Sequence, residues 1–147
     1  MKQKGFTLIE MMIVIAIIAI LVGIAIPRFK GMQDVANVSK AEAELKTIQI
    51  AIESYYMSNS NTYPDTSTTM VSSDLVDASP KIITSALYDP FGGDSVEYNY
   101  AKSDGGNYYI VWSVGINGIS DITGIDDEGD ITGDEEDDIY ATNGTPF

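Results

Sequence analysis

A run of acidic side chains near the carboxyl terminus is the clearest chemical signal in this sequence. Ten acidic residues occur between positions 121 and 138, and no Lys or Arg lies among them. They are Asp121, Asp126, Asp127, Glu128, Asp130, Asp134, Glu135, Glu136, Asp137 and Asp138. Carboxylates are the ligands that hard divalent cations such as calcium prefer. A solvated acidic surface is the alternative, and the run alone leaves both interpretations open.

The spacing within the acidic run favours a folded loop over a disordered tail. Glycine recurs at positions 118, 124, 129 and 133, and five isoleucines lie among the acids between 119 and 139. The run is not an EF-hand, because residues 126–130 lack that loop's glycine at the sixth position and its glutamate at the twelfth.

Composition excludes several classes of function. The 147 residues include no His and no Cys, which rules out thiol nucleophiles, Ser-His-Asp triads and ordinary zinc sites. No spaced pair of acids stands out from the run, so we expect no enzymatic activity. The formal net charge of -14 argues against binding to nucleic acid.

Charge is unevenly distributed along the chain. Residues 1–60 hold 6 basic and 5 acidic side chains, whereas residues 61–147 hold 2 and 17. The first part includes an apolar run from Phe6 to Ile26, in which Glu10 is the only charge. A hydrocarbon core needs roughly 20 such residues in a helix, so this run predicts a membrane span, with Lys2 and Lys4 on the cytoplasmic side.

Two other interpretations of the apolar run fit less well. A domain this small could scarcely bury a helix that is apolar all round. A cleaved secretory signal would need a shorter apolar stretch, although Gly23 and Ala25 resemble its cleavage site. A lone carboxylate in a span is costly unless paired. No basic residue lies between Lys4 and Arg28, so a partner for Glu10 must come from elsewhere.

The helix is expected to continue beyond Pro27, from about Thr7 to about Met57. A proline inside a helix removes a backbone donor and disturbs one turn. Beyond it, Ala41, Leu45, Ile48, Ile52 and Tyr55 follow the spacing of a helical apolar stripe. Residues 58–61, Ser-Asn-Ser-Asn, then predict the end of the helix.

The remainder of the chain predicts a small antiparallel sheet. Residues 62–88 suggest an irregular connection, with one short helical turn near 73–76. Residues 89–93, Asp-Pro-Phe-Gly-Gly, predict a turn. Strands are expected at 96–100 and 108–114, joined by a hairpin loop at 102–107, with Trp112 and the tyrosines in helix-facing or core packing. The expected fold class is α+β, with a long N-terminal helix packed on the sheet.

The amino-terminal residues resemble the processing and assembly signal of the type IV pilin superfamily. Lys4-Gly5-Phe6-Thr7-Leu8-Ile9-Glu10 combines a short basic leader, a Gly-Phe junction and a glutamate four residues after the Phe, all at the start of the span. The resemblance implies cleavage between Gly5 and Phe6 by a prepilin peptidase and methylation of Phe6. It also implies that Glu10 pairs with the amino group of Phe6 on a neighbouring subunit. Pro27 matches a proline common in this superfamily.

The body resembles the major pseudopilin of type II secretion systems. The matching features are Asp89-Pro90-Phe91-Gly92, the tyrosine-rich hairpin, the Gly115–Gly118 turn and the Asp137-Asp138-Ile139 end. That resemblance implies a bound calcium ion, held by the Val114 carbonyl, Asn117, Asp137, Asp138 and, less securely matched, Asp121. The sequence departs from the pattern at Phe91, at Asn117 and in the length of the loop from Gly118 to Asp137.

The resemblance predicts a leader at 1–5, a membrane and assembly segment at 6–30, and a soluble body at 31–147 with an acidic loop at about 115–140. The expected function is a single-pass inner-membrane subunit, with its body in the periplasm or outside the cell, extracted into a helical homopolymer. The implied partners are prepilin peptidase, the inner-membrane assembly platform and minor pseudopilins. A pilin of a type IV pilus is one alternative. A membrane-anchored, calcium-binding surface domain that never polymerises is another.

Overall fold

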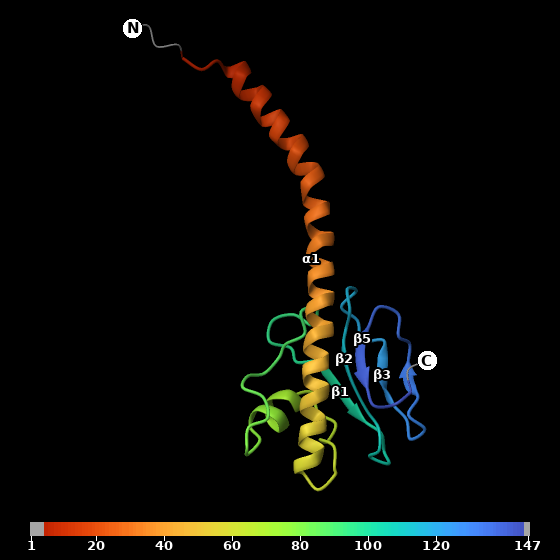
Figure 1. Ribbon diagram of the computed structural model, residues 1–147. Coiled ribbons are helices and arrows are strands. Elements are labelled where there is room, and N and C mark those ends of the chain that lie inside the picture. Colours follow the sequence, from red (N-terminus) through yellow and green to blue (C-terminus); the bar gives the residue numbers. More distant parts are fainter. Residues whose placement is uncertain (1–4, 146–147) are drawn as a thin grey trace. The chain divides into compact units, whose positions relative to one another are not determined.

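One long helix dominates the computed structural model, which describes residues 5–145 (Figure 1). Helix α1 covers Leu8–Ser58, 51 residues, and runs through Pro27 without a break. This confirms the helix predicted for residues 7–57. The chain forms two compact units, Met1–Ala36 and Asn37–Phe147, and α1 contributes to both.

The amino-terminal unit has no apolar core among its described residues. Phe6, Ile9, Ile17 and Leu21, like the other large apolar side chains up to Val35, are exposed. The first part of α1 is long and apolar enough to cross a membrane. A segment with this composition and exposure is stable only in an apolar environment, such as a bilayer or a bundle of like helices.

In the second unit, one face of α1 packs on the body. Ala41, Leu45, Ile48 and Ile52 are fully buried, as the predicted stripe requires, and Tyr55 is partly buried. Ala51, which lies between the stripe positions, is buried as well. On its polar face, α1 carries an ion pair between Lys40 and Glu44, with 3.8 Å between Nζ and Oε1.

A three-stranded antiparallel sheet covers this face of α1. Its strands are β1 (Asn99–Lys102), β2 (Tyr109–Ser113) and β5 (Ile139–Thr142), in the order β1-β2-β5. Trp112 pairs with Asn99 on one side and with Tyr140 on the other. The first strand begins three residues later than predicted, because Glu97 makes only an isolated bridge to Tyr88.

The segment predicted as one acidic loop contains more regular structure than expected. Strands β3 (Ile122–Ile125) and β4 (Ile131–Gly133) form a separate antiparallel hairpin within residues 115–140. Strand β5 follows as the third strand of the main sheet. Earlier in the chain, the helical turn predicted near 73–76 is a short π-helix, η1, at Val71–Val76.

The two faces of the main sheet bury two different clusters. Alternate residues of a strand point to opposite faces. Tyr109 and Val111 therefore join the α1 cluster, whereas Ile110 and Trp112 pack against Ile122 and its neighbours from the β3–β4 hairpin. Trp112 is thus a core residue, but on the face away from α1, and its Nε1 donates a 2.8 Å hydrogen bond to Ser120 Oγ. The hairpin in the acidic region is consequently tied to the sheet by apolar packing.

Candidate functional site

Glu10 and Thr7 together cap the amino terminus of α1. Its Oε2 accepts hydrogen bonds from both the backbone N–H and the Oγ1 of Thr7, each at 2.8 Å, and the Glu10 N–H donates to Thr7 Oγ1 at 3.3 Å. This reciprocal arrangement is a capping box. Its sequence signal is a Thr followed three residues later by a Glu, at the start of the apolar run. Gly5 and Phe6 precede this cap, while Lys2 and Lys4 lie outside the described residues.

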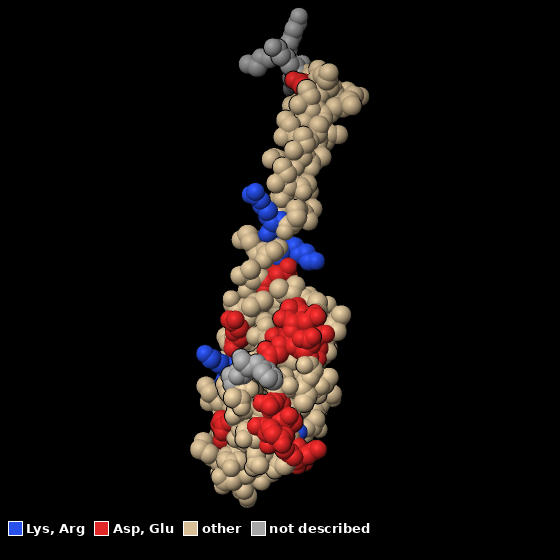
Figure 2. Space-filling view, turned by 90° about the vertical axis from the view of Figure 1, so that its right-hand side faces the viewer, with Lys and Arg blue, Asp and Glu red and all other residues tan. Residues whose placement is uncertain are grey.

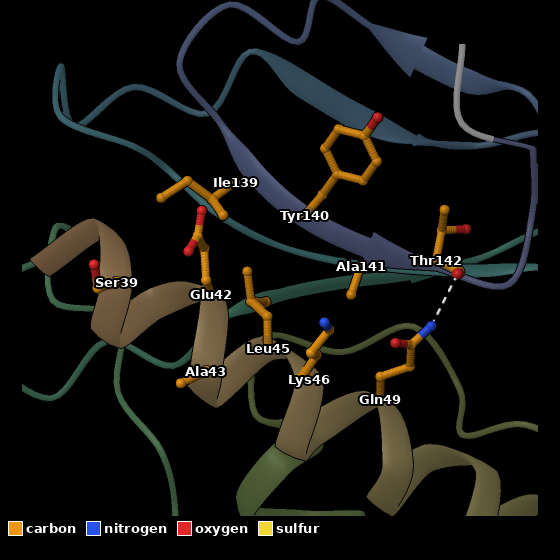
Figure 3. Close-up of a pocket in the computed structure, with 10 residues that line it drawn as sticks. All are labelled: Ser39, Glu42, Ala43, Leu45, Lys46, Gln49, Ile139, Tyr140, Ala141 and Thr142. Atoms are coloured by element: carbon orange, nitrogen blue, oxygen red, sulfur yellow. Dashed lines mark hydrogen bonds between the residues drawn. The ribbon is translucent and has the colours of Figure 1, made fainter.

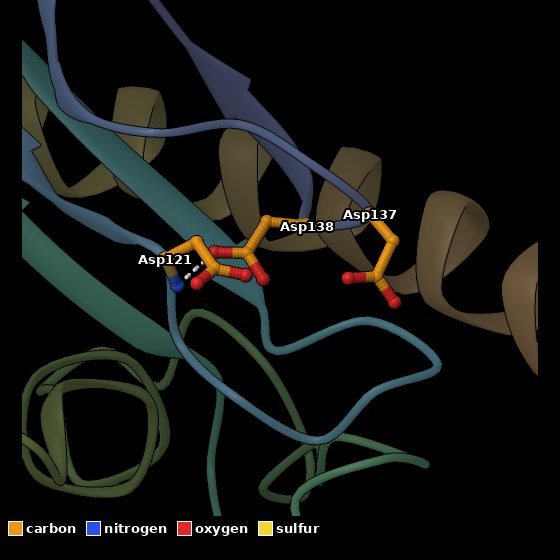
Figure 4. A group of neighbouring side chains, drawn as sticks. All are labelled: Asp121, Asp137 and Asp138. Carbon is orange, nitrogen blue, oxygen red and sulfur yellow. Dashed lines mark hydrogen bonds between the residues drawn. The ribbon is translucent and has the colours of Figure 1, made fainter.

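Three of the predicted calcium ligands come together in the body. Each of Asp121, Asp137 and Asp138 offers a carboxylate oxygen, and these oxygens lie within 4.8 Å of one another (Figure 4). Asp121 directly precedes β3, and Asp138 directly precedes β5. The two strands belong to different sheets, so the cluster forms where their starting points meet.

The Asp138 side chain is the most enclosed member of the cluster. It is 9% exposed, and its Oδ2 accepts hydrogen bonds from the backbone N–H groups of Asp121 and Ile122, both at 2.9 Å. Its Oδ1 is buried and has no hydrogen-bond partner within residues 5–145. Burial raises the pKa of this carboxyl; the two backbone bonds oppose the rise, and the nearby charges of Asp121 and Asp137 add to it. An unpartnered buried carboxylate oxygen is costly unless a cation or a proton meets it.

Asn117 links the other two acids. Its backbone N–H donates to Asp137 Oδ2 at 2.8 Å, and its Nδ2 donates to Asp121 Oδ2 at 3.3 Å. Its amide oxygen accepts a 2.6 Å bond from the Ile119 N–H. Asn117 therefore lies beside the cluster, with its amide oxygen engaged in the turn.

The backbone before Asn117 approaches Asp137 closely. Gly115 has φ +64°, and a Cβ at this position would collide with the main-chain carbonyl of Asp137. Glycine is required here both for the positive φ and for the contact. Val114, the predicted carbonyl ligand, directly precedes this glycine. All five predicted calcium residues thus lie in one region, and three of them converge.

Other acids of the run accept hydrogen bonds in turns and loops outside the cluster. Asp126 caps the β3–β4 turn, where its Oδ1 accepts bonds from the N–H groups of Glu128 and Asp130 at 3.0 and 2.8 Å. Asp127 accepts a bond from the Gly105 N–H, and Glu135 accepts one from the Tyr140 hydroxyl. Figure 2 shows the acidic side chains gathered in patches on one face of the body. Only three of the ten acids form the group suited to a metal among the described residues.

A groove runs between α1 and β5 (Figure 3). Its volume is about 710 Å³, and it lies between helix residues 39–49 and strand residues 139–142. Gln49 Nε2 donates a 3.0 Å hydrogen bond to the Thr142 carbonyl across it. Among the described residues β5 is an edge strand of its sheet, and this bond links it to α1, so the groove is a seam between packed elements.

The donor set of the acidic cluster consists of oxygen ligands of the kind that hard divalent cations take. Calcium takes six to eight oxygen ligands from carboxylates, amides and backbone carbonyls. The three carboxylates supply negative charge, and the buried Asp138 Oδ1 supplies an oxygen that the protein itself leaves unsatisfied. Bringing these groups together in the absence of a cation costs free energy through mutual repulsion.

Comparison with known proteins finds a match for the amino-terminal segment and relatives that extend over most of the chain. Residues 1–26 match the model of the prokaryotic N-terminal methylation motif. The chain is 31% identical to type II secretion system core protein G of Escherichia coli K12 over 140 residues, which cover 92% of this chain and 89% of that protein. No solved structure matches.

Two further relatives are a second core protein G and a type IV pilin. A core protein G of Klebsiella michiganensis is 31% identical over 105 residues, covering 63% of this chain and 71% of that protein. The type IV major pilin protein PilE1 of Neisseria gonorrhoeae is 36% identical over 108 residues, covering 74% of this chain but 48% of the pilin. The core protein G likeness extends through the body, where the acidic cluster lies. The chain therefore belongs to the type II secretion system core protein G family, within the type IV pilin superfamily.

Proposed function

We propose that this protein is the major pseudopilin of a type II protein secretion system, a structural subunit that polymerises into a filament. The observation that carries this proposal is the alignment with the E. coli core protein G over 89% of that protein's length. The alignment covers 92% of this chain, which also carries the methylation motif at residues 1–26. The long exposed apolar helix fits a single-pass membrane-anchored protein that is later transferred into a filament. We place the body in the periplasm or outside the cell.

Maturation would proceed at the start of the helix. A prepilin peptidase cuts between Gly5 and Phe6, and the new amino group of Phe6 is methylated. The capping box supports this step, because α1 begins at Leu8 and leaves the Gly5–Phe6 bond outside the helix, where a peptidase can bind it in an extended form.

Assembly would use the same residues. The Glu10 carboxylate pairs with the cationic amino group of Phe6 on the neighbouring subunit and so sets the register of the filament. Within a poorly hydrated helical core, an unpaired charge of either sign is strongly unfavourable, so the pair selects one alignment. Pro27 weakens one turn of α1 by removing a backbone donor, which lets the helix adjust on leaving the membrane. The assembly platform of the inner membrane and the minor pseudopilins are the expected partners.

The body would be held together by calcium. Asp121, Asp137 and Asp138 provide the carboxylates. The Val114 carbonyl and the second lone pair of the Asn117 amide oxygen, which also accepts the Ile119 N–H, complete the set. The bound ion supplies positive charge that offsets the repulsion among the acids. It would fix the start of β3 to the start of β5, and so lock the hairpin to the main sheet.

A type IV pilus pilin is the second candidate, favoured by the 36% identity to the gonococcal pilin over 108 residues. That alignment covers less than half of the pilin, whereas the core protein G alignment covers nearly the whole relative. An anchored calcium-binding domain that never polymerises would explain the span and the cluster, but neither Glu10 nor the Gly5–Phe6 junction.

The N-terminal chemistry is tested by mass spectrometry of the full chain after co-expression with a prepilin peptidase. We expect a mature protein that begins at N-methylated Phe6. The matched control is Gly5→Ala, which should remain uncut. An intact Met1 terminus on the wild-type chain in the presence of active peptidase would contradict the pseudopilin assignment and favour the anchored domain.

A further inference from the structure

Asp89 is a buried carboxylate outside the acidic run. It is 2% exposed and occupies the first position of the Asp-Pro-Phe-Gly turn. Both of its oxygens are used. Oδ1 accepts bonds from the Phe91 N–H at 2.9 Å and the Ser113 hydroxyl at 2.7 Å, and Oδ2 accepts one from the Val114 N–H at 2.9 Å.

These bonds join segments that are distant in the sequence. The Phe91 bond closes the turn itself, together with a 3.2 Å bond from the Gly92 N–H to the Asp89 carbonyl. The Ser113 and Val114 bonds reach the end of β2, 24 and 25 residues later. Ser113 Oγ also accepts a 3.4 Å bond from the Gly115 N–H. Asp89 therefore fixes three successive residues, two directly and one through a hydroxyl.

One of the fixed residues, Gly115, lies directly against the acidic cluster, and the chain reaches a second contact two residues later. Gly115 lies against the main-chain carbonyl of Asp137, and Asn117, two residues further on, donates its N–H to Asp137 Oδ2. A shift of the 113–115 backbone would move both contacts. No ion pair involves Asp89 among residues 5–145, so its side chain is held by these three hydrogen-bond donors.

We propose that Asp89 is the positioning residue of the proposed calcium site, holding the Val114–Gly115 backbone in place against Asp137. The inference rests on the proposed calcium binding. Asp89 does not contact the ion. It acts through Val114, whose N–H it binds and whose carbonyl is a proposed ligand. Groups that orient metal ligands in this way commonly change affinity when they are replaced.

The test is calcium titration calorimetry on the full chain in detergent micelles, after removal of calcium with a chelator. Asp89→Asn keeps the size of the side chain but replaces one acceptor oxygen by an NH2 donor, so the Phe91 and Val114 N–H groups can no longer both be accepted as they are by the two carboxylate oxygens. The matched control, Asp127→Asn, makes the same charge change at an acid that accepts the Gly105 N–H in another loop. Calcium-free melting curves, recorded in parallel, show that each variant is folded at the titration temperature.

We expect Asp89→Asn to weaken calcium binding by about tenfold or more, in line with other groups that orient metal ligands. The control should change affinity by less than about twofold, because exposed charges are screened. A residue with only a structural role would lower the calcium-free melting temperature and leave the affinity of the folded chain unchanged. That result would overturn the proposal.

If Asp89→Asn does not fold, a second variant tests the same proposal. Ser113→Ala removes one donor to Asp89 and the acceptor of the Gly115 N–H, and leaves the charge in place. It should also weaken binding, and unchanged affinity in Ser113→Ala would count against the positioning role. If the wild-type chain itself binds no calcium, the proposed calcium site fails and this inference falls with it. If instead the wild-type chain binds calcium and Asp89→Asn binds it equally well, only the positioning role of Asp89 fails.

Discussion

The carboxylate of Asp138 accepts a hydrogen bond from the backbone N–H of Asp121, 17 residues earlier, at 2.9 Å. This contact brings two like charges together at the junction of two sheets. The arrangement leaves one Asp138 oxygen buried and unpartnered. A cation at this point would convert a repulsive cluster into a cross-link between β3 and β5.

Calcium should stabilise the chain against heat. An ion that binds only the folded state at about 100 times its dissociation constant adds about 2.7 kcal/mol, which in a body of this size raises the melting temperature by roughly 10 °C. Differential scanning calorimetry of the full chain in micelles, with calcium and with chelator, measures the shift. Magnesium is the control, and it should give a smaller rise because it loses its waters reluctantly. Identical curves with calcium and chelator would reduce the cluster to a solvated surface.

Replacing Asp138 by Asn should affect the protein differently in chelator and in calcium. The Asn oxygen can still accept the two backbone bonds, while the buried charge disappears. Because burial raises the pKa of Asp138, its ionised form lowers the stability of the calcium-free fold at neutral pH. We therefore expect Asp138→Asn to melt no lower than wild type in chelator, and to lose most of the calcium-induced rise. Asp130→Asn, at an exposed acid outside the cluster, should keep that rise.

The helical part of the fold was predictable because its signals are local. The stripe from Ala41 to Ile52 and the Ser-Asn break identify the helix within a residue of its ends. Strand β5 was missed because Ile139–Thr142 has no distinctive pattern of its own. It becomes a strand by pairing with β2, some thirty residues earlier. Long-range pairing of this kind leaves little trace in four residues.

Gly115 is expected to tolerate no side chain. In Gly115→Ala, the positive φ costs about 1–2 kcal/mol, and the new Cβ would also collide with the Asp137 carbonyl. We predict a lower melting temperature and weaker calcium binding. Gly93→Ala is the matched control, since Gly93 has φ +89° but open space around its Cβ position. It should destabilise through φ alone and leave the calcium response intact. Equal behaviour of the two variants would show that the Asp137 contact is unimportant.

Alkaline pH should destabilise the body through its tyrosines. Burial, as the largest cause, raises the pKa of Tyr98, Tyr100 and Tyr109 above the ordinary value, and hydrogen bonds to Glu44 and Glu53 add to the rise at Tyr98 and Tyr109. Because these folded-state pKa values exceed those of the unfolded chain, their contribution is fully present below about pH 10 and is lost as the pH rises further. Urea unfolding at increasing pH should show the free energy of unfolding falling above about pH 10.

The variant Tyr109→Phe provides the comparison for that series. It removes one buried hydroxyl, so its free energy of unfolding should fall less steeply with pH than that of wild type. A parallel decline in both proteins would mean that Tyr109 does not contribute to the alkaline transition.

The sequence indicates which residues form the candidate site, but it does not indicate how they are arranged in space. Resemblance identified Asp121, Asp137 and Asp138, which the structure gathers within 4.8 Å. The β3–β4 hairpin that separates Asp121 from the other two was not foreseen, since glycine and isoleucine among acids fit a loop equally well. The sequence places Asp89 in a turn and in the segment that resembles the pseudopilin, with no indication that its side chain reaches β2. Its link to Val114 depends on tertiary packing, which spacing along the chain does not encode.

The most direct test of the central claim is filament assembly by Glu10 variants. Glu10→Gln keeps an oxygen that can accept the Thr7 bonds of the capping box, and removes only the charge. Glu10→Ala removes both. Each variant would be produced with a type II secretion assembly system, and sheared filaments and membrane-bound subunits would be measured by immunoblot.

We predict that both variants insert into the membrane at wild-type levels and give few or no filaments, because the amino group of Phe6 on the neighbouring subunit lacks its partner. Wild-type filament yield from Glu10→Gln would show that the charge does not align subunits, and would contradict assembly through a Glu10–Phe6 pair.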